Sequence, residues 1–409
     1  MDVFTITIPS SSSSSSTWMD SRIWSRLPQR LLERVIAFLP PPAFFRSRCV
    51  CKRWYALLFS DSFLEMHLSL SPRLHWFIFF INKTPLPTAV YNNNNNLTTR
   101  ANNDSTVACQ GFILDPRDNT WYRHVFNLIP PGFSPVSSSG GLIAWVSDHA
   151  AEKNLILYNP LSRAIAQLPQ TQRPRLYPTV GLAVGHSSLN VVVAGDDMIS
   201  PFAVKNLTTE CFHADAGGFF SMWDITCPLP RLCSLESGRM VFVSGKHYCM
   251  NYSPFSVLAY DGSANEWWKI QAPMRRFLRS PSLLECRGKL VLVAAVEKNK
   301  LNVPKSVRMW GLQSCGRTWV EVERMPQELY EQFAEAEGGR GFECVGNGDF
   351  IVMTICGSDA VLLFDFYRKG WNWVPPCPFA PGPGLRGFAY EPRLATPALG
   401  LLHPSSLSF

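Results

Sequence analysis

The sequence feature that most constrains the fold is a unit that recurs through most of the chain. Each unit holds a short apolar segment, a turn rich in Gly, Asn or Asp, an aromatic residue and then a proline. Three tryptophans of this unit, Trp267, Trp319 and Trp371, follow one another at intervals of 52 residues. Strand-sized segments with such a period are typical of the four-stranded blades of a β-propeller. We therefore predict an all-β ring beyond Pro72.

The length of this region predicts the number of blades. Residues 107–395, divided by a period of about 48, give six blades, although seven would also fit. Apolar segments at residues 76–80 and 388–390 are available to close the ring. The units resemble kelch repeats, but their Gly-Gly doublets are irregularly placed. Amphipathic segments between the strands are missing, which disfavours an α/β fold. The best helical candidate in this region is residues 327–336.

A helical pattern precedes the ring. Between Leu27 and Leu64 the apolar residues follow helical spacing, and three prolines at positions 40–42 end the first helix. We predict three short helices in a compact all-α module. The first helix is apolar over more than the stripe of about 100° that packing in two layers requires. Part of its surface is therefore expected to contact the neighbouring domain or a partner.

Composition predicts the domain boundaries and the class of protein. The serine run at residues 10–16 predicts a disordered N-terminus over residues 1–17. The helical module then spans residues 18–70, the propeller residues 71–395 and a C-terminal tail residues 396–409. With 46% hydrophobic and 17% charged residues, the 409-residue chain has a globular composition and can bury a large core.

Targeting signals and metal-binding patterns are both missing. Residues 1–9 contain no Lys or Arg and no apolar run of signal length, and nowhere do 18 apolar residues follow one another. We therefore expect no membrane span and a nuclear location, with the cytoplasm also compatible. The twelve cysteines form no C-x-x-C pair and the eight histidines are scattered, so we predict neither metal nor cofactor.

Two motifs have catalytic potential, and each has a simpler interpretation. Gly382, Gly384 and Gly387 match G-x-G-x-x-G, but they precede a strand-like segment rather than a helix, which argues against dinucleotide binding. Asp196 and Asp197 follow a strand, where neighbouring carboxylates usually form a solvated turn. No nucleophile or phosphate-binding motif accompanies them. The protein is therefore not expected to be an enzyme.

Charge is unevenly distributed along the predicted ring. The whole chain has a net charge of +7, whereas residues 269–308 alone carry ten Lys or Arg and two Glu. Residues 321–343 show the opposite bias, with seven Glu and two Arg. A basic sector of this kind can bind phosphates or an acidic protein surface, or it can simply be solvated. Because no DNA-reading helix accompanies it, we do not expect this protein to read a DNA sequence by itself.

The helical module resembles an F-box. A Leu-Pro pair, a helix, a second Leu-Pro pair, another helix and a Val-Cys-Lys-x-Trp run follow in the order of that family, although Arg30 stands where the family often has an acidic residue. The resemblance assigns to adaptor binding Leu27, Pro28, Leu31, Leu32, Val35, Ile36, Leu39, Pro40, Val50, Cys51 and Trp54. The expected fold class is thus α+β multidomain, with a three-helix F-box before an all-β kelch-like propeller.

The resemblance implies a function as well as a fold. F-box proteins with a propeller are receptor subunits of SCF-type ubiquitin ligases: the helices bind a Skp-type adaptor and, through it, a cullin, while the propeller captures a client. Such a subunit does not itself transfer ubiquitin.

Residues 24–48, 194–201, 272–281 and 300–306 are similar to floral F-box proteins of the UNUSUAL FLORAL ORGANS and FIMBRIATA type from flowering plants. That likeness implies co-regulation of a LEAFY-type transcription factor in floral meristem and organ identity. In a ternary complex the DNA backbone would be contacted by Arg275, Arg276, Arg279, Lys298 and Lys300. The alternative is a plain degradation receptor that recognises an acidic client degron without touching DNA.

Overall fold

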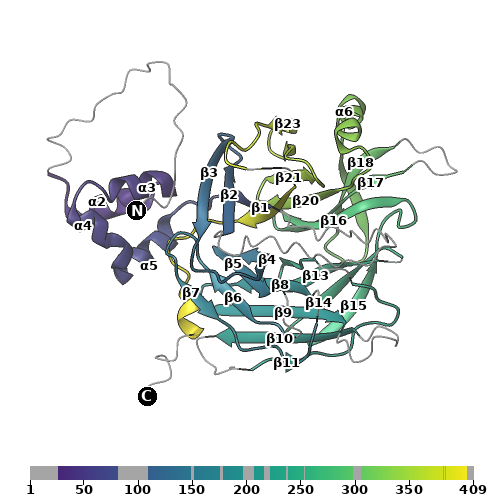
Figure 1. Ribbon diagram of the computed structural model, residues 1–409, viewed down its shortest axis with the longest axis horizontal. Coiled ribbons are helices and arrows are strands. Elements are labelled where there is room, and N and C mark those ends of the chain that lie inside the picture. Colours follow the sequence, from purple (N-terminus) through teal and green to yellow (C-terminus); the bar gives the residue numbers. More distant parts are fainter. Residues whose placement is uncertain are drawn as a thin grey trace, which may run out of the picture.

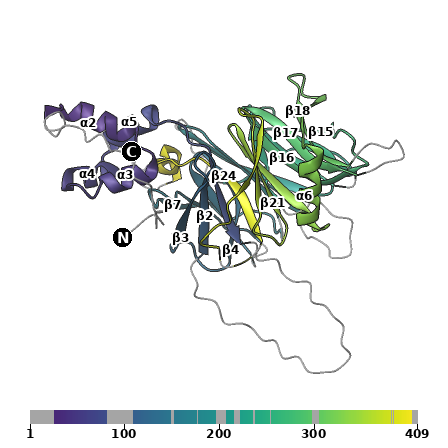
Figure 2. The same ribbon diagram turned by 90° about the horizontal axis from the view of Figure 1, so that it is seen from above.

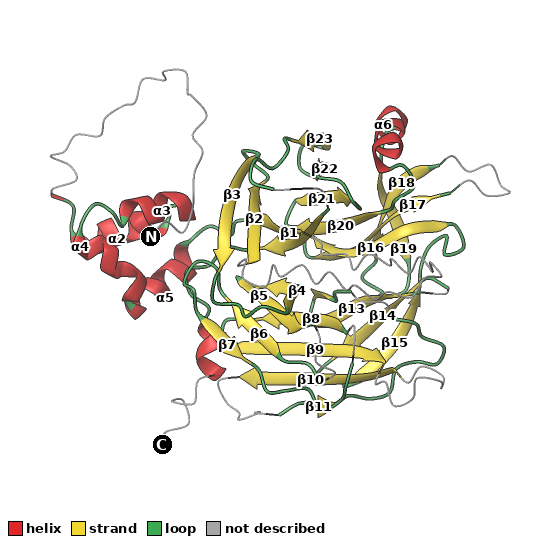
Figure 3. Cartoon of the chain, in the orientation of Figure 1, coloured by secondary structure: helices red, strands yellow, loops and turns green. Residues whose placement is uncertain are grey.

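The computed structural model describes residues 26–81, 109–148, 152–175, 178–196, 207–215, 222–235, 238–252, 254–297, 305–380, 382 and 384–402. Helices near the N-terminus precede a ring of β-sheets (Figures 1 and 3). The ring consists of six four-stranded antiparallel sheets. The described part of the chain therefore forms a six-bladed β-propeller, and the prediction of six blades is confirmed.

The N-terminal helices are α2 Gln29–Ala37, α3 Pro41–Ser47, α4 Lys52–Ala56, the 3-10 helix η1 Leu57–Phe59 and α5 Asp61–Leu70. The three predicted helices are confirmed as α2, α3 and α4 with η1, and α5 is a further helix that was not predicted. Its start carries a recognisable signal: the Ser60 hydroxyl accepts a hydrogen bond from the Phe63 amide at 3.4 Å, and Asp61 stands in the first turn.

The blades follow the order of the chain, with one exception. Blade 1 consists of β24 Leu385–Tyr390, β1 Trp76–Ile81, β2 Cys109–Asp115 and β3 Thr120–Phe126. Blade 2 consists of β4 Phe133–Ser139, β5 Leu142–Ser147, β6 Leu155–Tyr158 and β7 Ile165–Gln167. Blade 3 consists of β8 Thr179–Val184, β9 Ser188–Asp196, β10 Leu207–Asp215 and β11 Asp224–Ile225.

The remaining three blades lie between residues 241 and 374. Blade 4 consists of β12 Val241–Val243, β13 Lys246–Asn251, β14 Ser256–Asp261 and β15 Glu266–Gln271. Blade 5 consists of β16 Leu278–Cys286, β17 Lys289–Val296, β18 Ser306–Leu312 and β19 Trp319–Arg324. Blade 6 consists of β20 Phe342–Asn347, β21 Phe350–Ile355, β22 Val361–Asp365 and β23 Gly370–Val374.

The two ends of the ring meet in blade 1. Strand β24 pairs antiparallel with β1, so that Trp76 lies opposite Tyr390 and Ile78 opposite Phe388. The predicted closing segments are therefore confirmed. The innermost strands, which are β24 in blade 1 and the first strand of every other blade, contact one another around the ring.

The core lies between adjacent blades. In β17 the side chains of Leu292 and Ala294 pack with blade 4, whereas Val291, Val293 and Ala295 pack with blade 6. Successive residues of a strand point to opposite faces, and both faces of a blade are covered by its neighbours. This arrangement explains why the central strands are nearly continuous apolar runs rather than alternating ones.

Two helices pack on the propeller outside its blades. Helix α6, Gln327–Glu337, connects blades 5 and 6 and confirms the predicted helical segment; it buries Tyr330 and Phe333. The 3-10 helix η2, Pro397–Leu402, lies within the segment expected to be a tail, but its Ala398 and Leu399 are buried in the core between blades 2 and 3. The propeller therefore extends to residue 402, because this apolar turn covers the blade edge.

Strand direction gives the propeller two distinct ends. Because neighbouring strands are antiparallel, the start of β1, the β6–β7 connection and the end of β24 share one end. The helical module joins there, and Figures 1 and 2 show it apart from α6. The β15–β16, β17–β18 and β19–β20 connections lie at the other end. We call these the helical end and the loop end.

The helical module has an apolar core that it shares with the propeller. Ile36, Ala37, Phe44, Leu57 and Phe63 are buried together with Leu161 from the β6–β7 connection and Leu394 from the segment after β24. The ring of Phe44 stacks on that of Phe63 at 5.8 Å, and His67 of α5 lies against both rings. The module is therefore seated on the helical end by direct burial of side chains.

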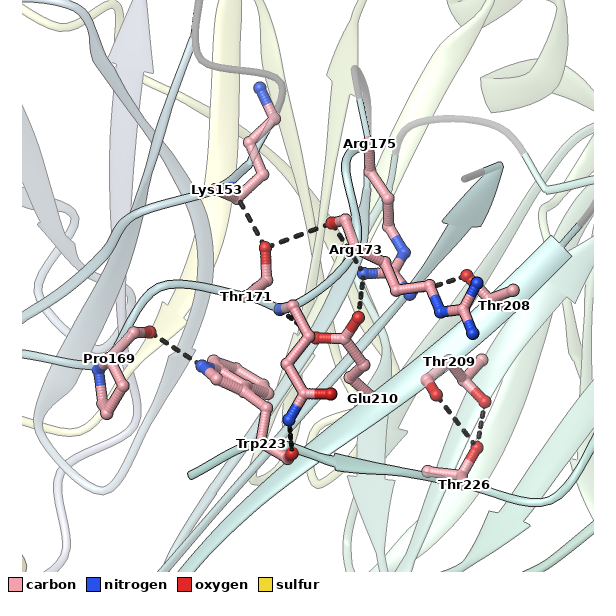
Figure 4. Close-up of polar contacts among 11 residues, drawn as sticks. Lys153, Pro169, Thr171, Arg173, Arg175, Thr208, Thr209, Glu210, Trp223 and Thr226 are labelled. Atoms are coloured by element: carbon pink, nitrogen blue, oxygen red, sulfur yellow. Dashed lines mark hydrogen bonds and ion pairs between the residues drawn. The ribbon is translucent and has the colours of Figure 1, made fainter. Parts of the chain in front are cut away.

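A buried polar cluster holds the start of blade 3 (Figure 4). Arg175 Nη1 donates to Glu210 Oε1 at 3.0 Å, and Arg175 Nη2 donates to Thr208 Oγ1 at 2.7 Å. The second carboxylate oxygen of Glu210 accepts the Gln172 amide at 2.9 Å. Nearby, Trp223 Nε1 donates to the Pro169 carbonyl at 2.7 Å. Together these bonds tie the β7–β8 connection to the outer strands of blade 3.

We predict that Glu210→Gln destabilises the propeller by about 3–5 kcal/mol, because it replaces the buried carboxylate that pairs with the Arg175 guanidinium by a neutral amide. Urea unfolding followed by tryptophan fluorescence measures this loss. The control is Glu266→Gln at an exposed position of β15, which we expect to change the free energy of unfolding by less than about 0.5 kcal/mol. Equal effects of the two substitutions would contradict the role of the buried pair.

The helical module should lose stability in mild acid because of His67. Burial lowers the pKa of His67 from 6.5 to about 4. The unfolded chain therefore binds more protons than the folded protein in this window, and the free energy of unfolding falls as the pH drops from 6.5 toward 4. We expect His67→Phe, which keeps a ring beside Phe44, to lose less stability between pH 7 and 5 than the unsubstituted protein. Identical losses in parallel urea titrations at the two pH values would count against this assignment.

Candidate functional site

Prolines set the two helix starts that carry the F-box pattern. Pro28 and Pro40 occupy the N-cap positions of α2 and α3 with extended backbone, and α3 begins with Pro41 and Pro42. A proline at the first helical positions loses no hydrogen bond, because the first amides of a helix have no partner within it. The prolines thus start α3, whereas α2 already ends at Ala37. The Leu-Pro pairs of the sequence mark helix beginnings.

Helix α2 presents an uncovered apolar stripe. Leu31, Val35 and Phe38 stand at positions i, i+4 and i+7, and their residues are 46%, 41% and 53% exposed. Leu31 and Val35 belong to the predicted adaptor-binding set, whereas Phe38 was missed although it lies on the same helix face. Ile36 was also assigned to that set, but it is 2% exposed and lies in the module core. Its surface is not available to a partner, since it faces the helices that pack against α2.

A second uncovered group lies around Arg48. Its guanidinium is 4.5 Å from the centre of the Tyr55 ring and 5.7 Å from that of Phe59, and its Nε donates to the Tyr55 carbonyl at 3.1 Å. Both aromatic side chains are largely exposed, as is Val50. Tyr55 and Phe59 were not predicted from the sequence. The sequence signal that could have identified them is their spacing, since two aromatic residues four positions apart lie on the same face of a helix.

The other predicted adaptor-binding residues lie on the same module with different exposure. Exposed are Pro28, Pro40 and Cys51; partly buried are Leu27, Leu32, Leu39 and Trp54. The partly buried residues Leu32, Leu39 and Trp54 pack against the module core. They help to hold the exposed residues in place, and part of their own surface remains exposed.

The basic sector of the sequence is not one basic surface. Arg279 Nη1 donates to Glu337 Oε1 of α6 at 2.5 Å, and its Nε lies 3.3 Å from Glu297. Arg308 Nη1 donates to Glu321 at 3.3 Å. The two stretches of opposite charge are neighbours in blade 5 and α6, so two arginines of the basic stretch are paired with glutamates of this region. Arg279, which was predicted to contact DNA, is thus already paired with Glu297 and Glu337, and its contact with DNA stays a prediction.

Two arginines of the basic sector remain in one turn at the loop end. Arg275 and Arg276 lie between β15 and β16, and neither has an ion pair with a described residue. The Glu297 amide donates to the Phe277 carbonyl at 3.0 Å, which places the start of the β17–β18 connection beside this turn. Lys298 and Lys300, the two other predicted contacts, belong to that connection and lie outside the described residues. We call Arg275 and Arg276 the basic turn.

The motifs with catalytic potential are not assembled into a site. Gly387 lies within β24 and Asp196 is the last residue of β9, while Asp197 falls outside the described residues. Among the residues that the structure describes, no three His, Cys, Asp or Glu side chains come together as metal ligands. In the same residues, none of the helices has the length and hydropathy to cross a membrane.

Comparisons with known proteins match both parts of the chain. Residues 24–66 match the F-box domain, and residues 113–330 match the KIB1-4 beta-propeller. The chain is 58% identical to Protein UNUSUAL FLORAL ORGANS of Arabidopsis thaliana, over 97% of this chain and 91% of that protein. It is 46% identical to Protein ABERRANT PANICLE ORGANIZATION 1 of Oryza sativa subsp. indica, over 97% and 95%. SKP1-interacting partner 15 of Arabidopsis thaliana is 23% identical, over 92% and 99%.

The two kinds of observation agree. The helices that carry exposed apolar residues fall within the F-box match, and the six blades include the propeller match. A family of this kind supplies the non-catalytic receptor subunits of SCF-type ubiquitin ligases, in which the F-box binds a Skp-type adaptor. The chain belongs to the family of F-box proteins with a β-propeller that includes UNUSUAL FLORAL ORGANS and ABERRANT PANICLE ORGANIZATION 1.

Proposed function

We propose that this F-box receptor holds its adaptor with the exposed residues of α2 and the Arg48 group, and that its propeller holds a LEAFY-type transcription factor on DNA in the nucleus. Co-regulation of that factor in floral meristem and organ identity would follow. The observation that carries the proposal is the separation of the two surfaces, one on the helical module and one at the loop end.

The α2 stripe has the character of an adaptor-binding surface. Burial of a Leu, Val or Phe side chain contributes about 1.5–3 kcal/mol. Burial of Leu31, Val35 and Phe38 together would therefore favour adaptor binding by several kcal/mol, before the entropic costs of association are subtracted. A relative named SKP1-interacting partner supports a Skp-type adaptor as the occupant. A cullin would then be joined through that adaptor.

We predict that Leu31→Ala combined with Val35→Ala weakens adaptor binding at least about tenfold without unfolding the protein, because both side chains are exposed in the free chain. Pull-down with a purified Skp-type adaptor, followed by titration, measures this change. As a matched control, Val320→Ala with Val322→Ala removes two exposed apolar side chains of blade 5 and should leave binding unchanged. Undiminished binding by the α2 variant would refute the surface.

The basic turn is suited to contact with DNA held by a partner. Arg275 and Arg276 lie in a turn at the loop end, whereas the adaptor would bind the helical module at the other end, so that both partners could bind together. The relatives named for floral organs and panicle organisation support a developmental role. The LEAFY-type partner is inferred from the similarity to the floral type of F-box protein. Each phosphate that a cation neutralises steepens the salt dependence of binding by about 0.9 in logarithmic slope.

We predict that Arg275→Glu with Arg276→Glu flattens the salt dependence of ternary assembly by about 1.8 in logarithmic slope. The measurement is a gel-mobility titration of the adaptor-bound protein, a LEAFY-type factor and labelled promoter DNA at several salt concentrations. Arg287→Glu, at an exposed arginine in the β16–β17 turn of the helical end, is the control for a change in net charge. If both variants change the slope equally, the basic turn does not contact the DNA.

A second candidate function is that of a plain degradation receptor. The same basic turn would attract an acidic segment of a client, without DNA. Absence of a slower ternary band, together with intact adaptor binding and client turnover that depends on Arg275 and Arg276, would favour this function over co-regulation.

A further inference from the structure

The central channel of the propeller contains an arginine that divides it. Arg239, just before β12, lines one cavity of about 180 Å³ toward the helical end and another of about 100 Å³ toward the loop end. Thr179, Glu343 and Arg386 line the second cavity, and all three stand at the first or second position of an innermost strand. This cavity, which we call the channel mouth, therefore opens at the loop end.

Arg239 is held by neighbours from two other blades. Its Nη2 donates to Glu343 Oε2 of blade 6 at 2.9 Å, and its Nη1 donates to the Gly387 carbonyl of blade 1. Its guanidinium also lies 4.9 Å from the centre of the Phe388 ring. Burial lowers the pKa of Arg239, and Arg386 adds to that effect, while Glu343 opposes it. The Arg239 guanidinium thus already has its counter-charge.

Arg386 lies near the same Glu343 carboxylate, but its ion pair with Glu343 is longer than that of Arg239. Its Nε lies 3.7 Å from the same Glu343 oxygen, which is too far for a hydrogen bond. The Nε atom is buried and makes no hydrogen bond with any described residue. Two guanidinium groups and one carboxylate leave a surplus of one positive charge in the mouth. A buried donor without an acceptor is costly, and a bound anion would remove that cost.

The size of the mouth favours a small anionic group. The cavity of about 100 Å³ has room for several waters or for one small anionic group such as a carboxylate. A carboxylate also matches the two parallel N–H groups that an arginine side chain presents.

We propose that the channel mouth binds the carboxylate of an Asp or Glu side chain presented by a client protein, with Arg386 as the residue that holds it. The proposal rests on the receptor role of the propeller and adds a specific contact to it. It is separate from the basic turn, which lies outside the channel. A client with an acidic residue at the tip of a loop would thereby be placed on the propeller axis.

The experiment uses the full chain bound to its adaptor and a fluorescein-labelled peptide of Gly and Ser residues with two central glutamates. Fluorescence anisotropy should show binding of this peptide and loss of it when both glutamates are replaced by glutamine. We expect Arg386→Gln to weaken binding at least tenfold, Arg386→Lys to weaken it less, and Arg231→Gln, which removes one charge from the exposed β11–β12 connection at the same end, to change it less than threefold.

Each other result would overturn the proposal. Equal weakening by Arg386→Gln and Arg231→Gln would mean diffuse attraction, and equal binding of the glutamine peptide would exclude a carboxylate site. Tighter binding of a phosphoserine peptide would replace the carboxylate by a phosphate. Thermal unfolding tests whether Arg386→Gln is folded. If it is not, Arg386→Lys becomes the deciding variant, and unweakened peptide binding by Arg386→Lys would refute the site. Adaptor binding in the same preparations shows independently whether the receptor role holds.

Discussion

The pairing of β24 with β1 is the contact on which the rest of the structure depends. It joins strands that are about 300 residues apart in the chain, and it gives blade 1 both its innermost strand and its neighbour. Without it, blade 1 would lack its innermost strand and blades 2 and 6 would each lose one covering face. The same pairing places Leu394 under the helical module and Arg386 in the channel mouth. The pairing of β24 with β1 thus closes the ring, and it also positions residues that pack against the helical module and residues of the proposed binding site.

The two ends of the ring separate two tasks. The helical module is tied to one end through burial of Leu161 and Leu394, so its orientation is set by packing rather than by a linker alone. The basic turn, α6 and the channel mouth lie at the other end. A receptor needs this division, because an adaptor and a client that bound to the same end would compete for space. The antiparallel order within each blade produces the division without any special residue.

Two arginines of blade 5 form ion pairs with glutamates of the same region of the molecule. Arg279 pairs with Glu337, which is 58 residues away in the sequence, and Arg308 pairs with Glu321 of the neighbouring strand; both pairs are partly buried. A charge that is already paired contributes little to a long-range field. Within this sector, Arg276 of the basic turn is an exposed arginine that forms no ion pair with a described residue.

The sequence by itself determined the architecture. The recurring tryptophans, the turn residues and the helical spacing of Leu31 and Val35 are local patterns, and a local pattern can be read without knowing what packs against it. Only the tertiary structure decided which of those residues face outward. Ile36 is buried and Phe38 is exposed because α3, α5 and the propeller cover one side of α2, and Arg279 is paired because α6 folds back onto blade 5. Contacts between residues far apart in the chain depend on how the elements pack in space, and no spacing rule within a segment contains that information.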